Sequence, residues 1–266
     1  MARIAVAATA PFGADVLEGL AGRHEVVELL TRPDRPRGRG RRPGAPPAKE
    51  RAERLGIPVR QEARLSGETP LAAGTVVVAA YGLLIPSGLL ERALWLNVHP
   101  SLLPRWRGAA PVERALMAGD EETGVTIHRT TPELDAGPIA AQEAFAVGPE
   151  DDAGAVYERS AALAVDLLDR VLRDGPEFRP QPEEGVRYAD KIRPEDRVLD
   201  LSRPPQELVN RVRALSPHIG ARAELDGRDV IVWRARMEDG RFVPVEVQPA
   251  GRRRMTYEEF RRGLRA

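Results

Sequence analysis

The sequence predicts an α/β protein in which a doubly wound parallel sheet is followed by a small, β-rich second domain. Over the first two-thirds of the 266 residues, short apolar runs alternate with helical patterns. Because these runs are continuously apolar, they are typical of parallel strands that are covered on both faces. Beyond residue 204 the chain shows short runs separated by Asp-Gly turns, which indicate antiparallel hairpins.

The first domain begins with RIAVAA at residues 3–8, whose unbroken apolar character predicts a buried strand. A helix is predicted over 13–22, because its apolar residues recur at helical spacing. The strand-like EVVELL follows at 25–30, and after it come a helical pattern at 47–55 and a short strand, GIPVR, at 56–60.

The strongest signal for a buried strand is TVVVAAY at residues 75–81, which is rich in β-branched valine. Helices are predicted at 85–93 and 109–118, and strands at 94–98 (LWLNV) and 124–130 (GVTIHRT). This repeated order of strands and helices predicts an open, Rossmann-like sheet.

The last part of the chain is predicted to hold a long helix and then the second domain. The amphipathic pattern at 151–173 is stopped by Gly175-Pro176. A further helix precedes two hairpins with Asp-Gly turns at 226–227 and 239–240, and the chain ends on a helical pattern. We expect domains at 1–185 and 204–266, joined by a linker at 186–203.

The composition limits the chemistry that the chain can carry. Forty basic and forty acidic residues give a net charge of zero, so any basic surface must be local. The absence of cysteine excludes disulfides, thiolate metal sites and cysteine nucleophiles. Since no apolar run approaches the roughly 18 residues of a membrane span, we expect a cytoplasmic protein without a membrane partner.

Asn97 and His99 stand at the end of a predicted strand and point to the same face. Ligands bind at the carboxyl ends of strands in open parallel sheets. An amide donor and an imidazole suit a carbonyl whose oxygen gains negative charge. The alternative is a structural pair, with the imidazole bonded to a backbone carbonyl and the amide capping a turn.

Two further segments favour a catalytic site. The apolar, irregular stretch from Ser101 to Pro104 follows directly and suits a pocket lining. Asp135 lies in a loop rich in Gly and Pro after another strand, where its carboxylate can orient His99 or help to deprotonate an amine. The alternative for Asp135 is a role in shaping the turn.

On these motifs the chain resembles the methionyl-tRNA formyltransferases, within the folate-dependent formyltransferase family, over nearly its whole length. The shared motifs are NVHPSLLPRWRGAAP at 97–111, LDAG at 134–137, the loop TRPDRPRGRG at 31–40 and VQPAG at 247–251 with Met255 and Phe260. The Asn–His–Asp set marks the wider family, whereas the arginine loop and the tail point to the branch that acts on tRNA.

The resemblance implies transfer of a formyl group from 10-formyltetrahydrofolate to the amino group of methionyl-initiator tRNA, a step that serves translation initiation. Asn97 would donate to the oxyanion, His99 would stabilise it or pass a proton, and Asp135 would hold His99. No metal is implied, and we expect a monomer. The residues implied for folate binding are Tyr81, Gly82, Ser101, Leu102, Leu103 and Pro104.

The same resemblance assigns a tRNA-binding role to the arginine loop, for which the alternative is a solvated loop. Its arginines suit bidentate phosphate contacts, and it lacks the glycine spacing of a dinucleotide site. The implied tRNA-binding residues are Arg35, Arg37, Arg39, Arg41 and Arg42, with weaker candidates at Arg211, Arg213, Arg222 and 252–254 in the second domain.

Three departures from the family pattern stand out. Ala8 replaces a usual glycine, Pro100 follows His99 where glycine is common, and the OB-like second domain looks shortened between Trp233 and Val243.

Two alternatives stay open: a formyltransferase acting on an amino-sugar nucleotide, and a non-catalytic RNA-binding relative. A nicotinamide dehydrogenase is the weakest hypothesis, because the glycine fingerprint is missing.

Overall fold

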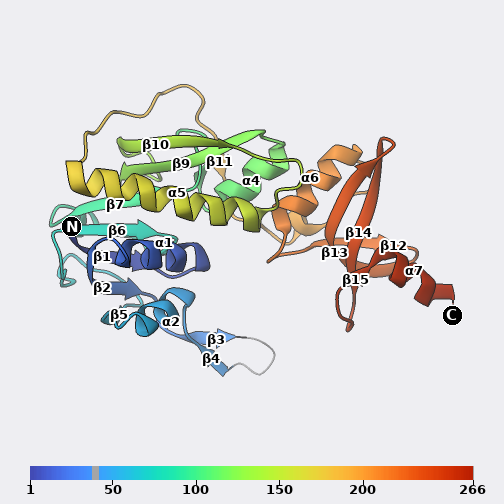
Figure 1. Ribbon diagram of the computed structural model, residues 1–266, viewed down its shortest axis with the longest axis horizontal. Helices are drawn as coiled ribbons and strands as arrows, with labels where there is room; N and C mark the ends of the chain where they lie inside the picture. Colours follow the sequence, from blue (N-terminus) through green and yellow to red (C-terminus); the bar gives the residue numbers. More distant parts are fainter. Residues whose placement is uncertain (38–41, 266) are drawn as a thin grey trace. The chain divides into compact units, whose positions relative to one another are not determined.

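A computed structural model describes residues 1–37 and 42–265, which fall into two compact units (Figure 1). The first unit comprises Met1–Arg107, Gly124–Ala144 and Glu158–Arg187. The second comprises Gly108–Thr123, Phe145–Tyr157 and the chain from Tyr188 onward. None of the helices in this described part is both long and apolar enough to cross a membrane.

The first unit is built on a seven-stranded sheet with the strand order β10-β9-β7-β6-β1-β2-β5. Helices α1, α2 and α3, and α5 from Glu158 onward, belong to the same unit (Figure 1). The strands are β1 (Arg3–Ala8), β2 (Glu25–Thr31), β5 (Val59–Gln61), β6 (Thr75–Ala79), β7 (Leu94–His99), β9 (Glu122–Arg129) and β10 (Ile139–Ala146). The helices are α1 (Pro11–Ala21), α2 (Pro47–Arg54), α3 (Ser87–Leu90) and α5 (Ala153–Asp174).

The predicted parallel sheet is confirmed for its central part and differs at one edge. Parallel pairs join β1 to β2 and β6, β6 to β7, and β2 to β5. Strand β9 runs antiparallel to β7, because the chain re-enters the sheet at the edge where β7 ends. The helix between these strands, α4 (Pro111–Ala118), belongs to the second unit.

Two local predictions were inaccurate. The helix expected over 85–93 is the single turn α3, and strand β10 was missed. Strand β10 carries only a weak apolar signal, because six of its eight residues, IAAQEAFA, are Ala, Gln or Glu. The formation of this strand therefore depends more on pairing with a neighbouring strand than on the β propensity of its own side chains.

The apolar core of this unit lies under β1, β6 and β7, with α3 packed against it. It contains Ala5, Ala7, Val76, Val78, Trp95 and Leu89, and the indole nitrogen of Trp95 donates to the carbonyl of Leu89 at 3.1 Å. Burial of a valine or leucine side chain, as at Val76 and Leu89, stabilises the fold by about 1.5–3 kcal/mol. The core thus fixes the three strands whose carboxyl ends carry the candidate site.

A buried histidine connects the amino terminus to α5. Only 4% of His24 is exposed, and its Nδ1 atom accepts a hydrogen bond from the backbone N–H of Ala2 at 3.2 Å. Its Nε2 atom lies 3.3 Å from Oδ1 of Asp169. Since Nδ1 is an acceptor here, the ring is neutral in the folded protein. Burial, the largest influence, lowers the pKa of His24, against the raising effect of Asp169.

We expect the substitution His24→Gln to reduce the loss of stability in acid. With a lowered pKa in the folded state, this histidine contributes stability above pH 6.5 that is lost as the pH falls from 6.5 towards the folded pKa. One such group contributes a slope of up to about 1.4 kcal/mol per pH unit. Urea unfolding of both proteins between pH 5 and 7 measures it, and parallel curves of stability against pH would contradict the prediction.

The second unit holds an antiparallel sheet in the order β12-β13-β14-β15, together with three helices (Figure 1). The strands are β12 (Ala221–Leu225), β13 (Arg228–Glu238), β14 (Arg241–Pro249) and β15 (Met255–Thr256), and the other helices are α6 (Pro205–Leu215) and α7 (Tyr257–Arg265). Both predicted Asp-Gly turns are confirmed, because each of the four residues has a positive φ. With four strands, the sheet is small, as expected from the short segment after Trp233.

Short elements complete the described chain. The two-residue strands β8 (Arg107–Gly108) and β11 (Tyr188–Ala189) pair with each other. A 3₁₀ turn, Glu195–Arg197, lies in the same 186–203 region as β11. Here Arg114 forms an ion pair with Asp196 at 2.8 Å, so this region has specific contacts with α4.

Candidate active site

The polar residues at the end of β7 form the centre of the candidate site. Asn97 lies opposite His128 of β9, and His99 lies opposite Thr126. Because alternate residues of a strand share a face, Asn97 and His99 project to the same side of the sheet. His99 is buried, with 4% of the residue exposed.

A backbone carbonyl orients the His99 ring. The Nε2 atom lies 2.7 Å from the carbonyl oxygen of Trp106, and since a carbonyl only accepts, Nε2 carries a proton and donates it. In the neutral ring Nδ1 is therefore unprotonated, and it lies 3.6 Å from Oδ2 of Asp135. Nδ1 is thus the atom at which His99 can take up a proton, with a carboxylate beside it.

Asp135 is the carboxylate around which the other polar side chains gather. Its Oδ1 atom lies 3.4 Å from Nδ2 of Asn97 and 3.6 Å from Nε2 of His128. The structure therefore brings together the three predicted catalytic residues, from β7 and from the loop between β9 and β10. One expectation is refined: at 3.6 Å, Asp135 is too far to hydrogen-bond His99, so the Trp106 carbonyl holds the ring instead.

His128 is the residue at this site that the sequence analysis missed. It is 1% exposed, and its Nδ1 atom donates to the carbonyl of Arg129 at 3.0 Å. Its Nε2 atom consequently accepts from Nδ2 of Asn97 at 2.9 Å. The available signal was a histidine near the end of the strand GVTIHRT, but only the pairing of β9 with β7 places it beside Asn97.

The electrostatics of the site favour a neutral imidazole at His99. Burial lowers the pKa of His99 and outweighs the Asp135 carboxylate and the Trp106 carbonyl, which raise it. A neutral, buried imidazole next to a carboxylate can accept a proton and stabilise the resulting charge. Within residues 1–37 and 42–265, no three His, Asp or Glu side chains are grouped so that they could hold a metal ion.

The predicted folate segment 101–104 lies beside this centre. Thr126, opposite His99, donates to the carbonyl of Ser101 at 2.7 Å and accepts from the N–H of Leu103 at 3.1 Å. Gln142 donates to the carbonyl of Leu103 at 2.9 Å. These hydrogen bonds connect the irregular segment 101–104 to β9 and β10, and they fix its position next to His99.

The other predicted folate residues, Tyr81 and Gly82, follow β6, the neighbour of β7 in the sheet. Tyr81 is 2% exposed, and burial raises the pKa of its phenol. Its hydroxyl has no hydrogen-bond partner among the described residues. Its carbonyl accepts from Thr9 at 2.8 Å, which joins this turn to the end of β1.

The base of the arginine loop forms a short hairpin, where the sequence indicated only a loop. Strand β3 (Arg35–Arg37) pairs antiparallel with β4 (Arg42–Gly44). Arg39 and Arg41 lie outside the described residues. At the start of the hairpin, Asp34 is bound by Lys49 at 2.9 Å and by Gln61 at 2.6 Å, so this entry to the loop is anchored.

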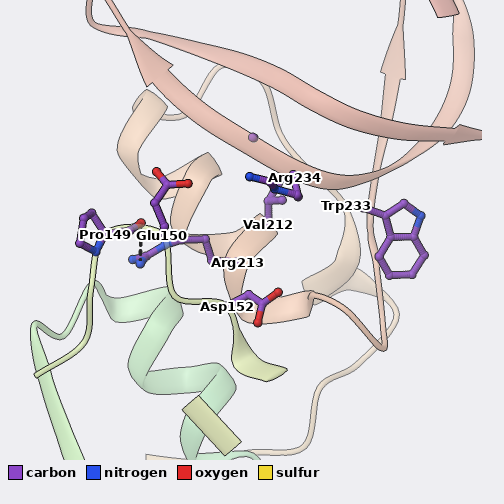
Figure 2. A pocket seen from close by; sticks show the side chains of 8 residues that line it. Pro149, Glu150, Asp152, Val212, Arg213, Trp233 and Arg234 are labelled. Carbon is purple, nitrogen blue, oxygen red and sulfur yellow. Dashed lines mark hydrogen bonds between the residues drawn. The ribbon is translucent and has the colours of Figure 1, made fainter. Parts of the chain in front are cut away.

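The second unit has a cleft of its own, of about 330 Å³, at the end of α6 (Figure 2). One NH₂ group of Arg213 donates to the carbonyls of Gly148, Pro149 and Asp151 at 2.8, 3.0 and 3.3 Å. Another donates to Asn210 at 3.0 Å. The guanidinium of Arg213, a weaker RNA-binding candidate, is therefore engaged in hydrogen bonds to the loop 148–151. Figure 2 shows its side chain extending towards Pro149.

Two other candidates of the second unit are also engaged in its fold. Arg211 donates to the carbonyls of Asp196 and Val198, both at 3.3 Å. Arg254 lies over the ring of Trp233, with 3.6 Å from its guanidinium carbon to the ring centroid. Such a cation–π contact stabilises the fold by about 0.5–2 kcal/mol.

Comparisons with known proteins agree with this arrangement. The formyl transferase family profile matches residues 2–172, and the profile of the formyl transferase C-terminal domain matches residues 191–243. A methionyl-tRNA formyltransferase of Methylobacterium nodulans is 41% identical over an alignment of 293 positions, gaps included, which covers 97% of this chain and 94% of the relative.

Solved structures share the fold. The methionyl-tRNA formyltransferase from Clostridium thermocellum superposes with a TM-score of 0.66 at 14% identity, over 94% of this chain and 99% of the other. An N-formyltransferase from Helicobacter canadensis, solved with folinic acid and dTDP-3-aminofucose, gives a TM-score of 0.67 at 16% identity. It covers 90% of this chain and 88% of its own.

Proposed function

Since the chain belongs to the formyl transferase family, we propose that it transfers a formyl group from 10-formyltetrahydrofolate to the free amino group of methionyl-initiator tRNA. The choice of methionyl-tRNA as the acceptor rests on the 41% identity to a methionyl-tRNA formyltransferase across 97% of the chain. The product is N-formylmethionyl-tRNA, which serves translation initiation and places the reaction in the cytoplasm.

The chemistry begins with attack of the amine on the formyl carbon. A C–N bond forms, the carbonyl electron pair moves to oxygen, and a tetrahedral oxyanion results. Asn97 donates an N–H to this oxyanion. Both of its amide protons face acceptors, His128 at 2.9 Å and Asp135 at 3.4 Å, so the oxyanion replaces the longer and weaker of these contacts.

His99 moves the proton. Its Nδ1 atom takes the proton that the attacking amine loses, and Asp135, 3.6 Å away, stabilises the imidazolium. The same proton then passes to the folate nitrogen as the bond from that nitrogen to the formyl carbon breaks. The free α-amine has a pKa near 7.7, so a weak base is sufficient.

The remaining parts of the site follow the family pattern. We assign folate binding to Tyr81, Gly82 and the segment 101–104, and contact with the tRNA to the arginine loop. We further propose that residues 1–185 carry catalysis, that 186–203 connect the domains and that 204–266 bind tRNA. A monomer is sufficient for this assignment, since all groups named for catalysis come from one chain.

The test is a formylation assay with two acceptors side by side. Purified protein and 10-formyltetrahydrofolate are incubated with charged initiator tRNA or with a dTDP-linked amino sugar, and products are identified by mass spectrometry. We expect formylation of the methionyl-tRNA alone. Formylation of the sugar alone would refute the proposed acceptor, and no product in either assay would favour a non-catalytic RNA-binding protein.

A further inference from the structure

Gln181 uses all of its polar atoms to join two segments of the candidate site. Its Nε2 atom donates to the carbonyls of Asp135 and Gly137 at 2.7 and 2.8 Å. Its Oε1 atom accepts from two nitrogens of Arg107, at 2.6 and 3.1 Å. Because carbonyls only accept and a guanidinium only donates, the orientation of this amide is fixed by its partners.

The loop that Gln181 holds is one that needs support. Asp135 has a φ of +47°, in the left-handed region that non-glycine residues rarely adopt. At Gly137 an added Cβ would lie 1.8 Å from the carbonyl oxygen of Arg129, so the loop is pressed against the end of β9. Arg129 on one side and Gln181 on the other therefore determine the position of residues 135–137.

That position controls the electrostatics of the centre. The Asp135 carboxylate reaches Asn97, His99 and His128 at 3.4–3.6 Å, distances at which a small shift changes every contact. A misplacement of about 1 Å at a reacting group can cost around 10²-fold in rate. A residue that fixes the Asp135 backbone thus acts on all three contacts at once.

We propose that Gln181 is a positioning residue for formyl transfer, which sets the place of the Asp135 carboxylate relative to His99 through the backbone of residues 135–137. The inference rests on the proposed function for its kinetic consequence. It assigns a role to a residue in the stretch rich in Pro and Glu after α5, far in sequence from the motifs of the site.

Two variants distinguish the hydrogen bonds that Gln181 donates to the Asp135 loop from those that it accepts from Arg107. Gln181→Met removes all four hydrogen bonds, whereas Gln181→Glu keeps an acceptor for Arg107 and loses the donors to Asp135 and Gly137. If the donors matter, both variants lose about 10–100-fold in kcat, with KM for either substrate changed less than about threefold. Glu184→Gln, at an exposed residue of the same segment, is the matched control.

Three kinetic outcomes overturn the proposal. These are wild-type kcat in both variants, retention of kcat by the glutamate variant alone, and a loss confined to KM. Rates are expressed per folded molecule, with the folded fraction taken from thermal unfolding, so that a destabilised variant still gives an answer.

A second measurement does not depend on the reaction. NMR titration of the histidine side chains follows His99 directly, with His99→Asn used to assign its signal among the four histidines. Since Asp135 raises the pKa of His99, displacement of the carboxylate in Gln181→Met is expected to lower that pKa. An unchanged titration overturns the proposal even if the wild type formylates neither acceptor, whereas the formylation assay alone decides the proposed function.

Discussion

Asp135→Asn is expected to lower kcat for formylation of methionyl-tRNA by about 10³-fold, within the usual range for loss of an acid–base group. The substitution keeps the shape of the side chain and removes its charge. The imidazolium that forms at His99 during the reaction then lacks its counter-charge 3.6 Å away. Steady-state kinetics with charged tRNA measure the effect, and KM for the tRNA is expected to change little.

The pH profile gives an independent check on the same variant. Because Asp135 raises the pKa of His99 in the folded protein, its neutralisation is expected to move the acidic limb of kcat/KM to lower pH. Asp174→Asn, an exposed residue at the end of α5, serves as the control. A profile that keeps its position while kcat falls would mean that Asp135 acts on some group other than His99.

Asn97→Ala is expected to lower kcat by about 10²–10³-fold, the usual effect of removing one oxyanion donor, or about 2.7–4 kcal/mol. The variant also leaves Nε2 of His128 without the donor that it has at 2.9 Å. Binding of folate, measured by fluorescence titration, is expected to persist, because the segment 101–104 keeps its bonds to Thr126 and Gln142.

The Asn97 variant also decides between a catalytic and a binding protein. Circular dichroism and thermal unfolding establish that the variant is folded. Activity equal to that of the wild type, or absent from both proteins, would contradict a catalytic role for Asn97 and favour a relative that only binds RNA. A loss in kcat with folate binding retained would separate chemistry from binding at this residue.

Most of the central sheet could be read from the sequence because each strand carries its own apolar signal. Strands β1, β2, β6 and β7 lie within one or two residues of the predicted ranges. The position of the candidate site was predicted from a general rule: residues at the carboxyl ends of parallel strands meet at one edge of the sheet. Asn97 and His99 were found in this way, whereas Asp135 was found from its loop rich in Gly and Pro and from the LDAG motif; the three side chains do converge.

The partners of these residues could not be predicted in the same way. His128 reaches Asn97 only because β9 pairs antiparallel with β7 in a register that places them opposite each other. The Trp106 carbonyl that holds His99, and Gln181 that holds the Asp135 loop, come from segments without regular structure. A sequence pattern carries no information on which backbone carbonyl a folded loop will present.

The sequence by itself determined the central strands β1, β2, β6 and β7, the two Asp-Gly hairpins and the identity of the three polar groups, because each depends on residues close together in the chain. The tertiary structure alone decided the direction of β9, the inclusion of α4 in the second unit and the tautomers of His99 and His128. These features arise from hydrogen bonds between distant segments, whose geometry exists only once the chain has folded.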